Sequence, residues 1–497
     1  MSAAAAAWLM TSLDPHPLSV ALVQVAANLP LFLWAIPAGA LADIVDRRKL
    51  LIAGECAIMA AAIPLAILVA RHRVTPASLL WMSFAVSSGI AITAPAWQAV
   101  VTELVPRPEL PAAISANSVG INVSRAVGPA LSGLVVRLLG IAAPFWIDAF
   151  SNAGVIGGLL WWHPPATAQA ELPPEPFGSA LRTGLRHARF NAPLGATLIR
   201  TAAFMIFASA YWGLLPLVMR DQIGGGPALY GAVLGAIGAA GVAASLALPW
   251  VTATLGADRL LAVATVGTAI AMVLFGLAHS AGIAVLAALI AGACWMGAVS
   301  SLNLSAQVAL PDWVRGRGLA VFVTVLFGAM SLGNSLWGEV AALAGLPAAH
   351  FLAAAGALSA AALTWRWKLQ TGSGLDLSPS MHWPAPITTR KIEGDRGPVL
   401  VMVEYHIEPR HRAAFLHALA RFSRERRRDG AYDWRVFEDP AEEGKIVETF
   451  LTDSWLEHLR QHARITRADR LLEQAVQQFQ NQDGPKTTHL IALQGGD

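Results

Sequence analysis

Long apolar segments alternate with short polar ones over most of the chain. A helix needs about 20 apolar residues to cross a bilayer, and most of these segments reach that length. The predicted spans are residues 18–42, 50–70, 77–104, 112–136, 141–162, 194–219, 228–252, 260–278, 282–304, 318–343 and 347–367. A shorter apolar stretch before Asp14 and Pro15 is interpreted as the end of a truncated first helix. The pattern predicts an all-α integral membrane region with twelve helical elements.

The apolar region repeats its own pattern of helix-breaking residues. Two sets of proline and glycine stand at equal spacings: Pro106, Gly128 and Gly133 in one, and Pro311, Gly333 and Gly338 in the other. The residues between the two halves are rich in proline and arginine. We therefore predict two six-helix bundles, residues 1–162 and 194–369, joined by a cytoplasmic linker of residues 163–193.

Composition and charge narrow the class of protein. Charged residues are 13% of the chain, against about 25% in soluble proteins, and the mean hydropathy is +0.53. The formal net charge of +3 gives no reason to expect a nucleic-acid partner. Lys and Arg gather in one alternate set of loops, which the positive-inside rule assigns to the cytoplasm. We expect a multi-pass membrane protein whose C-terminal region lies in the cytoplasm.

The polar segment GALADIVDRRK (residues 39–49) joins two predicted spans and carries five charges. It resembles the loop between helices two and three of major facilitator superfamily (MFS) transporters, in the exporter branch that includes enterobactin-exporter-like and transmembrane secretion effector proteins. The resemblance implies an MFS fold and a cytoplasmic gate latch, formed by Gly39, Asp43, Arg47 and Arg48. In that family the aspartate caps the start of helix eleven and pairs with the loop arginine. The alternative is that these charges only set the topology.

Charged and polar residues inside the spans are candidates for the transport pathway. Arg125 lies near the middle of the span at 112–136, where an unpaired charge is costly, and Asp148 is the acid at the nearest depth. The candidate pathway residues are Arg125, Asp148, Asn122, Gln98 and Asn152. For the amides, an ordinary hydrogen bond between helices is the alternative.

The segment around Arg125 reads NVSRAVGPALSG and resembles the Gly-Pro signature of helix five in exporters and antiporters. Its motif residues are Gly128, Pro129 and Gly133, which permit close packing and a bend. An ordinary packing kink is the alternative interpretation.

The composition changes beyond residue 369. Residues 370–397 form a linker, and residues 398–497 alternate strand and helix patterns in the order β-α-β-β-α-β, with a single helix expected over residues 454–479. This order predicts a cytosolic α+β ferredoxin-like domain. The domain resembles antibiotic-biosynthesis-monooxygenase dimeric α+β barrels, which implies a possible homodimer. His458 and His462 stand four residues apart, but no third ligand is evident, so we interpret them as part of a solvated helix face and expect no metal site.

These observations predict a secondary active transporter, not an enzyme, with no cofactor. By resemblance, it exports a small amphipathic molecule by alternating access, coupled to protons, within the lipid bilayer. Two alternatives stay open: a membrane-anchored monooxygenase or haem-handling protein acting through the C-terminal domain, and a non-transporting sensor.

Overall fold

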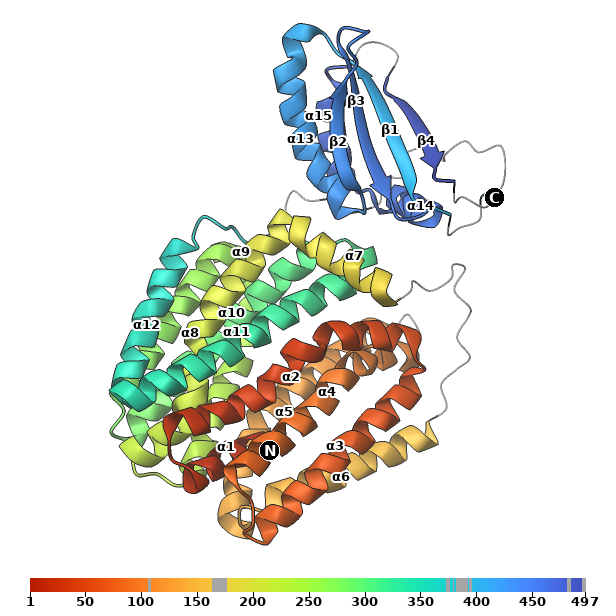
Figure 1. Cartoon of the computed structure of the whole chain (residues 1–497). Coiled ribbons are helices and arrows are strands. Elements are labelled where there is room, and N and C mark those ends of the chain that lie inside the picture. Colours follow the sequence, from red (N-terminus) through yellow and green to blue (C-terminus); the bar gives the residue numbers. More distant parts are fainter. Residues whose placement is uncertain are drawn as a thin grey trace. The chain divides into compact units, whose positions relative to one another are not determined.

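The computed structural model describes residues 1–105, 109–162, 177–371, 376–378, 380, 392, 396–480 and 484–493. The chain divides into two compact units. The first comprises Met1–Phe177, Ala196–Ala306 and Leu319–Thr371, and the second comprises Gly178–Gly195, Gln307–Gly318 and Gly372–Asp497. Figure 1 shows the helices and strands along the chain.

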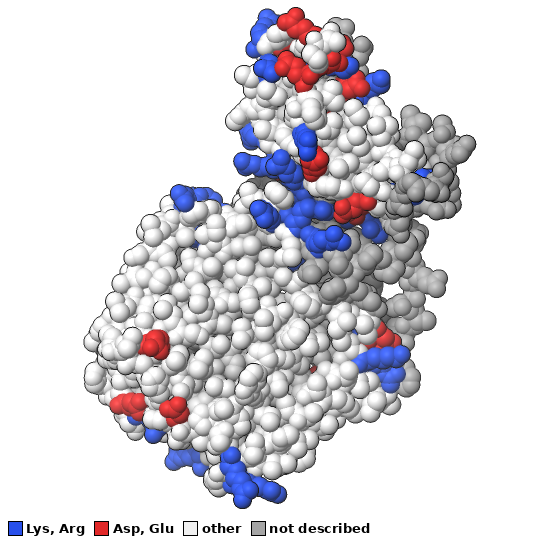
Figure 2. Space-filling view, viewed as in Figure 1, with Lys and Arg blue, Asp and Glu red and all other residues white. Residues whose placement is uncertain are grey.

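Long helices form the membrane part, as the apolar pattern predicted (Figure 1). They are α1 (Ser2–Leu13), α2 (Pro17–Ile44), α3 (Arg47–Ala70), α4 (Pro76–Leu104), α5 (Leu110–Leu139), α6 (Ala143–Trp161), α8 (Ala192–Leu217), α9 (Pro227–Gly276), α10 (Ala281–Val308), α11 (Arg315–Ala344) and α12 (Leu346–Leu363). Within the described residues, eight helices are long and apolar enough to cross a membrane, or nine if the bent pair α5–α6 is one span. Figure 2 shows that the visible surface of these helices carries few charges.

Helix α9 contains two of the predicted spans. Its 50 residues are interrupted at Gly256, where φ is 72° and ψ is 165°. That backbone conformation has a positive φ, which glycine adopts without the steric cost that a Cβ imposes. The predicted loop at residues 252–259 is therefore a sharp bend with no intervening irregular segment.

Glycines bring helices from the two bundles into close contact. A Cβ at Gly133 of α5 would lie 2.8 Å from the Cα of Gly231 in α9, and a Cβ at Gly338 of α11 would lie 3.0 Å from the Cα of Leu18 in α2. Small residues at such crossings let helix backbones approach each other in a membrane, where van der Waals packing drives association. The two bundles therefore meet along α5–α9 and along α2–α11.

The C-terminal domain is an α+β domain, as predicted. Its elements are β1 (Val399–His406), α13 (Arg412–Arg428), β2 (Tyr432–Glu438), β3 (Lys445–Thr452), α14 (Trp455–Arg464), α15 (Arg467–Gln477) and β4 (Lys486–Ile491). The four strands are antiparallel in the order β2-β3-β1-β4, and the helices cover one face of the sheet (Figure 1). This is the ferredoxin-like arrangement. Alternate residues of β1 from Val399 to Tyr405 face the core, where Phe415, Leu419 and Phe450 pack.

One detail of this domain was predicted wrongly. The single helix expected over residues 454–479 is two helices, α14 and α15, separated at Ile465 and Thr466. Thr466 begins α15 with a capping box, since its hydroxyl accepts from the Asp469 N–H and the Asp469 carboxylate accepts from the Thr466 N–H at 2.9 Å. These bonds satisfy backbone donors that a continuous helix would have paired internally, so the break is favoured locally.

The second unit also contains α7 (Phe177–Phe190) from its second residue onward, a helix within the predicted linker, and the short helix η3 (Asp312–Val314). The Asn191 amide donates to the Ala309 carbonyl at 2.8 Å, which ties the end of α7 to the segment before η3. The Arg464 guanidinium stacks over the Trp313 ring at 4.4 Å. The attraction between a guanidinium and an aromatic ring is stronger when the guanidinium is shielded from water, so this contact stabilises the unit.

Candidate functional site

The charged loop between α2 and α3 is very short in the structure. Gly39 and Asp43 lie in the last turns of α2, and Arg47 and Arg48 lie in the first turn of α3, so only Val45 and Asp46 stand between the helices. The Asp46 carboxylate caps α3 by accepting from the Lys49 N–H at 3.0 Å. A carboxylate at this position offsets the unfavourable placement of three cations at the positive end of a helix.

Arg48 anchors this loop to the end of α6. Its Nε donates to the Leu159 carbonyl at 2.8 Å, and its Nη2 donates to the Leu160 carbonyl at 2.6 Å. The last carbonyls of a helix have no partner within the helix and carry partial negative charge, so a cation is favourable there. The Asp43 side chain, and with it the predicted cap on helix eleven, lies outside the described residues.

A matching anchor holds the bend in α9. Asp258, two residues after Gly256, accepts from the Arg200 guanidinium at 3.2 Å and from the Leu369 N–H at 3.1 Å. Arg200, which is 2% exposed, also donates to the Trp367 carbonyl at 3.1 Å. In each bundle, therefore, charged groups hold a tight connection between helices against the segment that ends the bundle.

A mostly apolar cavity with a few polar groups lies in the N-terminal bundle, among α1, α2, α3, α4 and α6. Its polar lining consists of Ser2, Gln24, Ser83, Ser87 and Asp148, and its empty volume is about 610 Å³, part of which is open to solvent. The rest of the lining is apolar, and it includes Val23, Leu65, Ile90 and Phe145. An acid, an amide and hydroxyls within an apolar enclosure can orient a small molecule with both polar and apolar parts.

The predicted pathway residues whose side chains the structure describes do not gather at one site. Asp148 lines the cavity, whereas Gln98 is exposed on α4 and Asn152 is half-buried on α6, and neither is part of the lining. The side chains of Asn122 and Arg125, and so the predicted pairing of Arg125 with Asp148, lie outside the described residues.

The glycine motif of α5 divides into two environments. A Cβ at Gly128 would meet no atom within 4 Å, whereas a Cβ at Gly133 would lie 2.6 Å from the Pro227 carbonyl oxygen. The Pro129 carbonyl oxygen in turn lies 3.1 Å from a Cβ placed at Gly231. Gly133 is therefore a contact between the two bundles, and Gly231 is its partner, which the sequence analysis missed.

Another acid of the N-terminal bundle is buried. Glu55 of α3 is 6% exposed, and the Trp97 indole of α4 donates to its carboxylate at 3.2 Å. A buried carboxyl that holds a hydrogen bond between two helices stabilises their packing. Glu55 is not part of the cavity lining, so we assign it a structural role.

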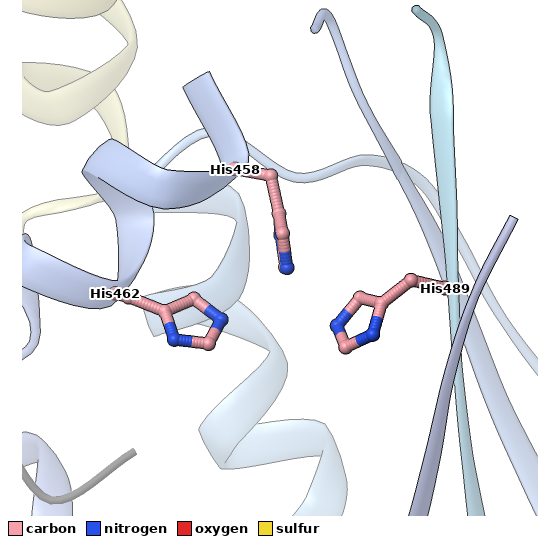
Figure 3. A group of neighbouring side chains, drawn as sticks. All are labelled: His458, His462 and His489. Carbon is pink, nitrogen blue, oxygen red and sulfur yellow. The ribbon is translucent and has the colours of Figure 1, made fainter. Parts of the chain in front are cut away.

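Three histidines cluster in the C-terminal domain (Figure 3). His458 and His462 project from α14 toward His489 of β4, and the ligand atoms of the three rings lie within 4.8 Å of one another. His458 is 1% exposed, so the expectation that these histidines belong to a solvated helix face is wrong for His458. His489 comes from a strand distant in the sequence, and the pairing of β4 with β1 brings it close to the other two histidines.

Comparison with known proteins agrees with the architecture. A sequence model of the family described as transmembrane secretion effector matches residues 1–495. The multidrug efflux pump Tap of Mycolicibacterium fortuitum is 26% identical over 69% of this chain and 85% of its own length. The staphyloferrin A transporter of Staphylococcus aureus is 23% identical over 50% of this chain and 62% of its own length. A crystal structure of a POT family transporter with 5-aminolevulinic acid matches with a TM-score of 0.57 at 13% identity, over 73% of this chain and 91% of that one. The chain therefore belongs to the transmembrane secretion effector family, and its membrane part has the fold of MFS transporters.

Proposed function

We propose that this protein exports a small amphipathic molecule across a bacterial inner membrane by alternating access. The cavity that combines Asp148 and Gln24 with an apolar lining is the observation that carries this proposal. It suits a molecule of mixed polarity, and the two relatives act in multidrug efflux and staphyloferrin A transport. A drug, a siderophore or another secondary metabolite is therefore the proposed substrate class. The two bundles would rock about their glycine contacts to expose the cavity to each side in turn.

Proton coupling is part of the proposal. An acidic side chain inside a membrane bundle is energetically costly, so its presence there indicates a function. Proton relays commonly use such residues. Asp148 is the acid of the cavity lining, so it is the proposed proton carrier. Arg125 on α5 stays a proposed partner on the same pathway.

The loop between α2 and α3 is the proposed latch. Arg48 fixes the loop to α6 within the N-terminal bundle. Asp43 and Arg47, at the ends of α2 and α3, are then the residues that would engage the other bundle and release it during the cycle. The distribution of Lys and Arg supports a cytoplasmic position for this loop and for the C-terminal domain.

Substitution of the two aspartates tests the proposal. In cells that express the protein, we expect wild type to lower the accumulation of ethidium and Hoechst 33342 severalfold. Asp148→Asn and Asp43→Asn should each abolish most of that difference, since one removes the titratable group of the cavity and the other removes the charge of the latch. Fluorescence of the dyes in loaded cells measures the effect, and an immunoblot of isolated membranes measures protein level.

Asp221→Asn is the control, because Asp221 lies in the short helix η2 (Val218–Gln222), is about half exposed and is not part of the cavity lining. Full export by Asp148→Asn at normal membrane level would refute the role of Asp148. If cells with the wild-type protein accumulated as much dye as cells without it, the result would argue against an exporter of amphipathic cations.

The C-terminal domain is proposed to pair with a second copy. By strand register, Leu400, Met402, Phe437 and Leu490 lie on the sheet face opposite the helices, and Phe437 and Leu490 are each 50% exposed. Exposed apolar residues gathered on one sheet face commonly mark an interface. Light scattering of the full-length protein in detergent should give the mass of a dimer, and Phe437→Glu with Leu490→Glu should give a monomer.

Oxidation chemistry in this domain stays a second hypothesis that rests on resemblance alone.

A further inference from the structure

We propose that His458, His462 and His489 form a binding site for a divalent transition metal of the zinc class in the C-terminal domain. The three ligand nitrogens would come from one helix and one edge strand, with a fourth position left for water or another ligand. This inference is independent of the transport function proposed above.

Local structure places the three rings on a common side of the domain. Ser454 caps the start of α14 by accepting from the Glu457 N–H at 3.2 Å, which sets the helix in register. The spacing of four residues then puts His458 and His462 on one helix face. His489 pairs with Val401 across β4 and β1, and Val401 is a core residue on the face that the helices cover. Residues directly opposite in an antiparallel pair share a face, so His489 points toward α14.

The distances suit a metal after a small closure of the rings. The centroids of His458 and His462 are 4.7 Å apart, as are those of His458 and His489. Zn–N bonds of about 2.0–2.1 Å in a tetrahedron require nitrogens roughly 3.3 Å apart. The present limit of 4.8 Å between ligand atoms is therefore within about 1.5 Å of the bound geometry. Rotation about the side-chain bonds can supply that movement, and Figure 3 shows the rings converging on a common space.

The burial of the His458 ring nitrogens is a second observation that favours a bound ligand. Among the described residues, neither ring nitrogen of His458 makes a well-aligned hydrogen bond, and the Gln461 amide is its polar neighbour. Burying a polar atom without a partner is unfavourable, so such atoms in proteins usually have one. A metal bound to one ring nitrogen would remove that cost.

The ordinary chemistry of imidazole suits metal binding at this site. An unperturbed histidine has a pKa of about 6.5, so most such rings are neutral near pH 7 and offer a nitrogen lone pair to a metal. The nearby cation Arg426 is itself compensated by Glu448 at 3.6 Å, a carboxylate that is 0% exposed.

The donor set selects the class of metal. All three ligands are imidazoles, which suit zinc, copper, nickel and iron, whereas calcium and magnesium prefer oxygen. Three protein ligands and an open position characterise zinc sites that bind water or substrate. His462 and His489 are half-buried, so an ion has a route to the site.

Metal titration of the full-length protein tests the site. Protein purified in detergent with a histidine-free affinity tag would be stripped with a chelator and titrated with zinc sulfate, with bound zinc counted by mass spectrometry. We expect one zinc per chain, and cobalt chloride in its place should give visible absorption bands of a tetrahedral site. His462→Gln and His489→Gln should each weaken zinc binding at least tenfold, since these half-buried residues can change without disturbing the core.

His417→Gln is the matched control, because His417 is an exposed histidine on α13 of the same domain. Its zinc affinity should equal that of wild type. Zinc binding that is absent in wild type, or equal in all four proteins, would overturn the proposal. Binding of haemin through His458 with no stoichiometric zinc would overturn it too, in favour of a haem site. Circular dichroism of each variant confirms that the domain has kept its fold.

Discussion

Gly133→Ala is expected to destabilise the membrane part by about 1–3 kcal/mol, or more, and to reduce dye export in proportion. The added Cβ would lie 2.6 Å from the Pro227 carbonyl oxygen and 2.8 Å from the Gly231 Cα. Both atoms belong to backbone, so no side-chain rotation relieves the overlap and α5 must move away from α9. Gly133→Leu should prevent the two helices from packing altogether. The thermal midpoint of the purified protein in detergent measures the loss.

Gly128→Ala is the control, because it makes the same change five residues earlier in the same helix. A Cβ at Gly128 would meet no atom within 4 Å. Alanine favours helix over glycine by about 1 kcal/mol, so this variant should be as stable as wild type or slightly more stable. Equal midpoints for Gly133→Ala and Gly128→Ala would show that the two bundles do not depend on the close approach at Gly133.

The fold could be predicted from the sequence because each level of the pattern pointed to the same architecture. Long apolar segments in a bilayer form helices, because a helix pairs all of its backbone N–H and C=O groups within the segment itself. The strand and helix order of residues 398–497 likewise specified the α+β class. The missed break at Thr466 carried a local signal, because Thr466 and Asp469 have the spacing of a capping box. A helical periodicity on both sides concealed it.

The candidate sites were less accessible to sequence reasoning, because they depend on contacts between distant segments. Asp148 was found since an acid in a membrane span is conspicuous, whereas Ser83 and Ser87 of the cavity are common residues at a helical spacing. His489 stands on a separate strand, and its register with Val401 is not encoded in any local motif. Contacts between segments distant in the sequence determine which residues line the cavity and which histidines lie together.

The anchors of the two bundles illustrate a further limit. The residues at the bend in α9 keep little of the charged sequence found between α2 and α3. In the structure Arg48 binds carbonyls at the end of α6, and Asp258 accepts the Leu369 N–H beyond α12. The sign of the charge is reversed, yet a carboxylate and a guanidinium can both bind backbone at a helix end. The charged sequence between α2 and α3 is therefore not repeated at the bend in α9, although both connections are bound to the segment that ends their bundle.

Arg428→Met is expected to destabilise the C-terminal domain by about 3–5 kcal/mol near pH 8. Arg428 is buried between acids: its Nε lies 2.8 Å from an Asp429 oxygen, its Nη2 lies 2.8 Å from an Asp469 oxygen, and it also pairs with Glu425. Methionine has a similar length but no charge, so it would leave these carboxylates buried without a cation. Hydrogen exchange of the α13 and α15 amides in the full-length protein measures the loss of stability.

The loss should depend on pH in a defined direction. Burial, the largest cause, raises the pKa of Glu425 from 4.5 to about 7 and also raises the pKa of Asp429. A carboxyl whose pKa is raised on folding contributes stability below its unfolded pKa and loses it as the pH rises through its folded pKa. Arg428 lowers the pKa of both groups, so without it both pKa values rise further. The variant should therefore recover part of its stability between pH 8 and pH 5 as these carboxyls bind protons.

Arg424→Met separates this effect from a general loss of positive charge on α13. Arg424 lies in the same helix and is exposed, so its removal should change the free energy of unfolding by less than about 0.5 kcal/mol at either pH. If Arg428→Met were as stable as Arg424→Met at pH 8, the buried carboxylates would not need their cation. If its deficit grew toward pH 5, the acids would be ionised throughout and the inferred protonation would be wrong. A deficit that shrinks on acidification, in Arg428→Met alone, is the outcome that a buried arginine among raised-pKa carboxyls requires.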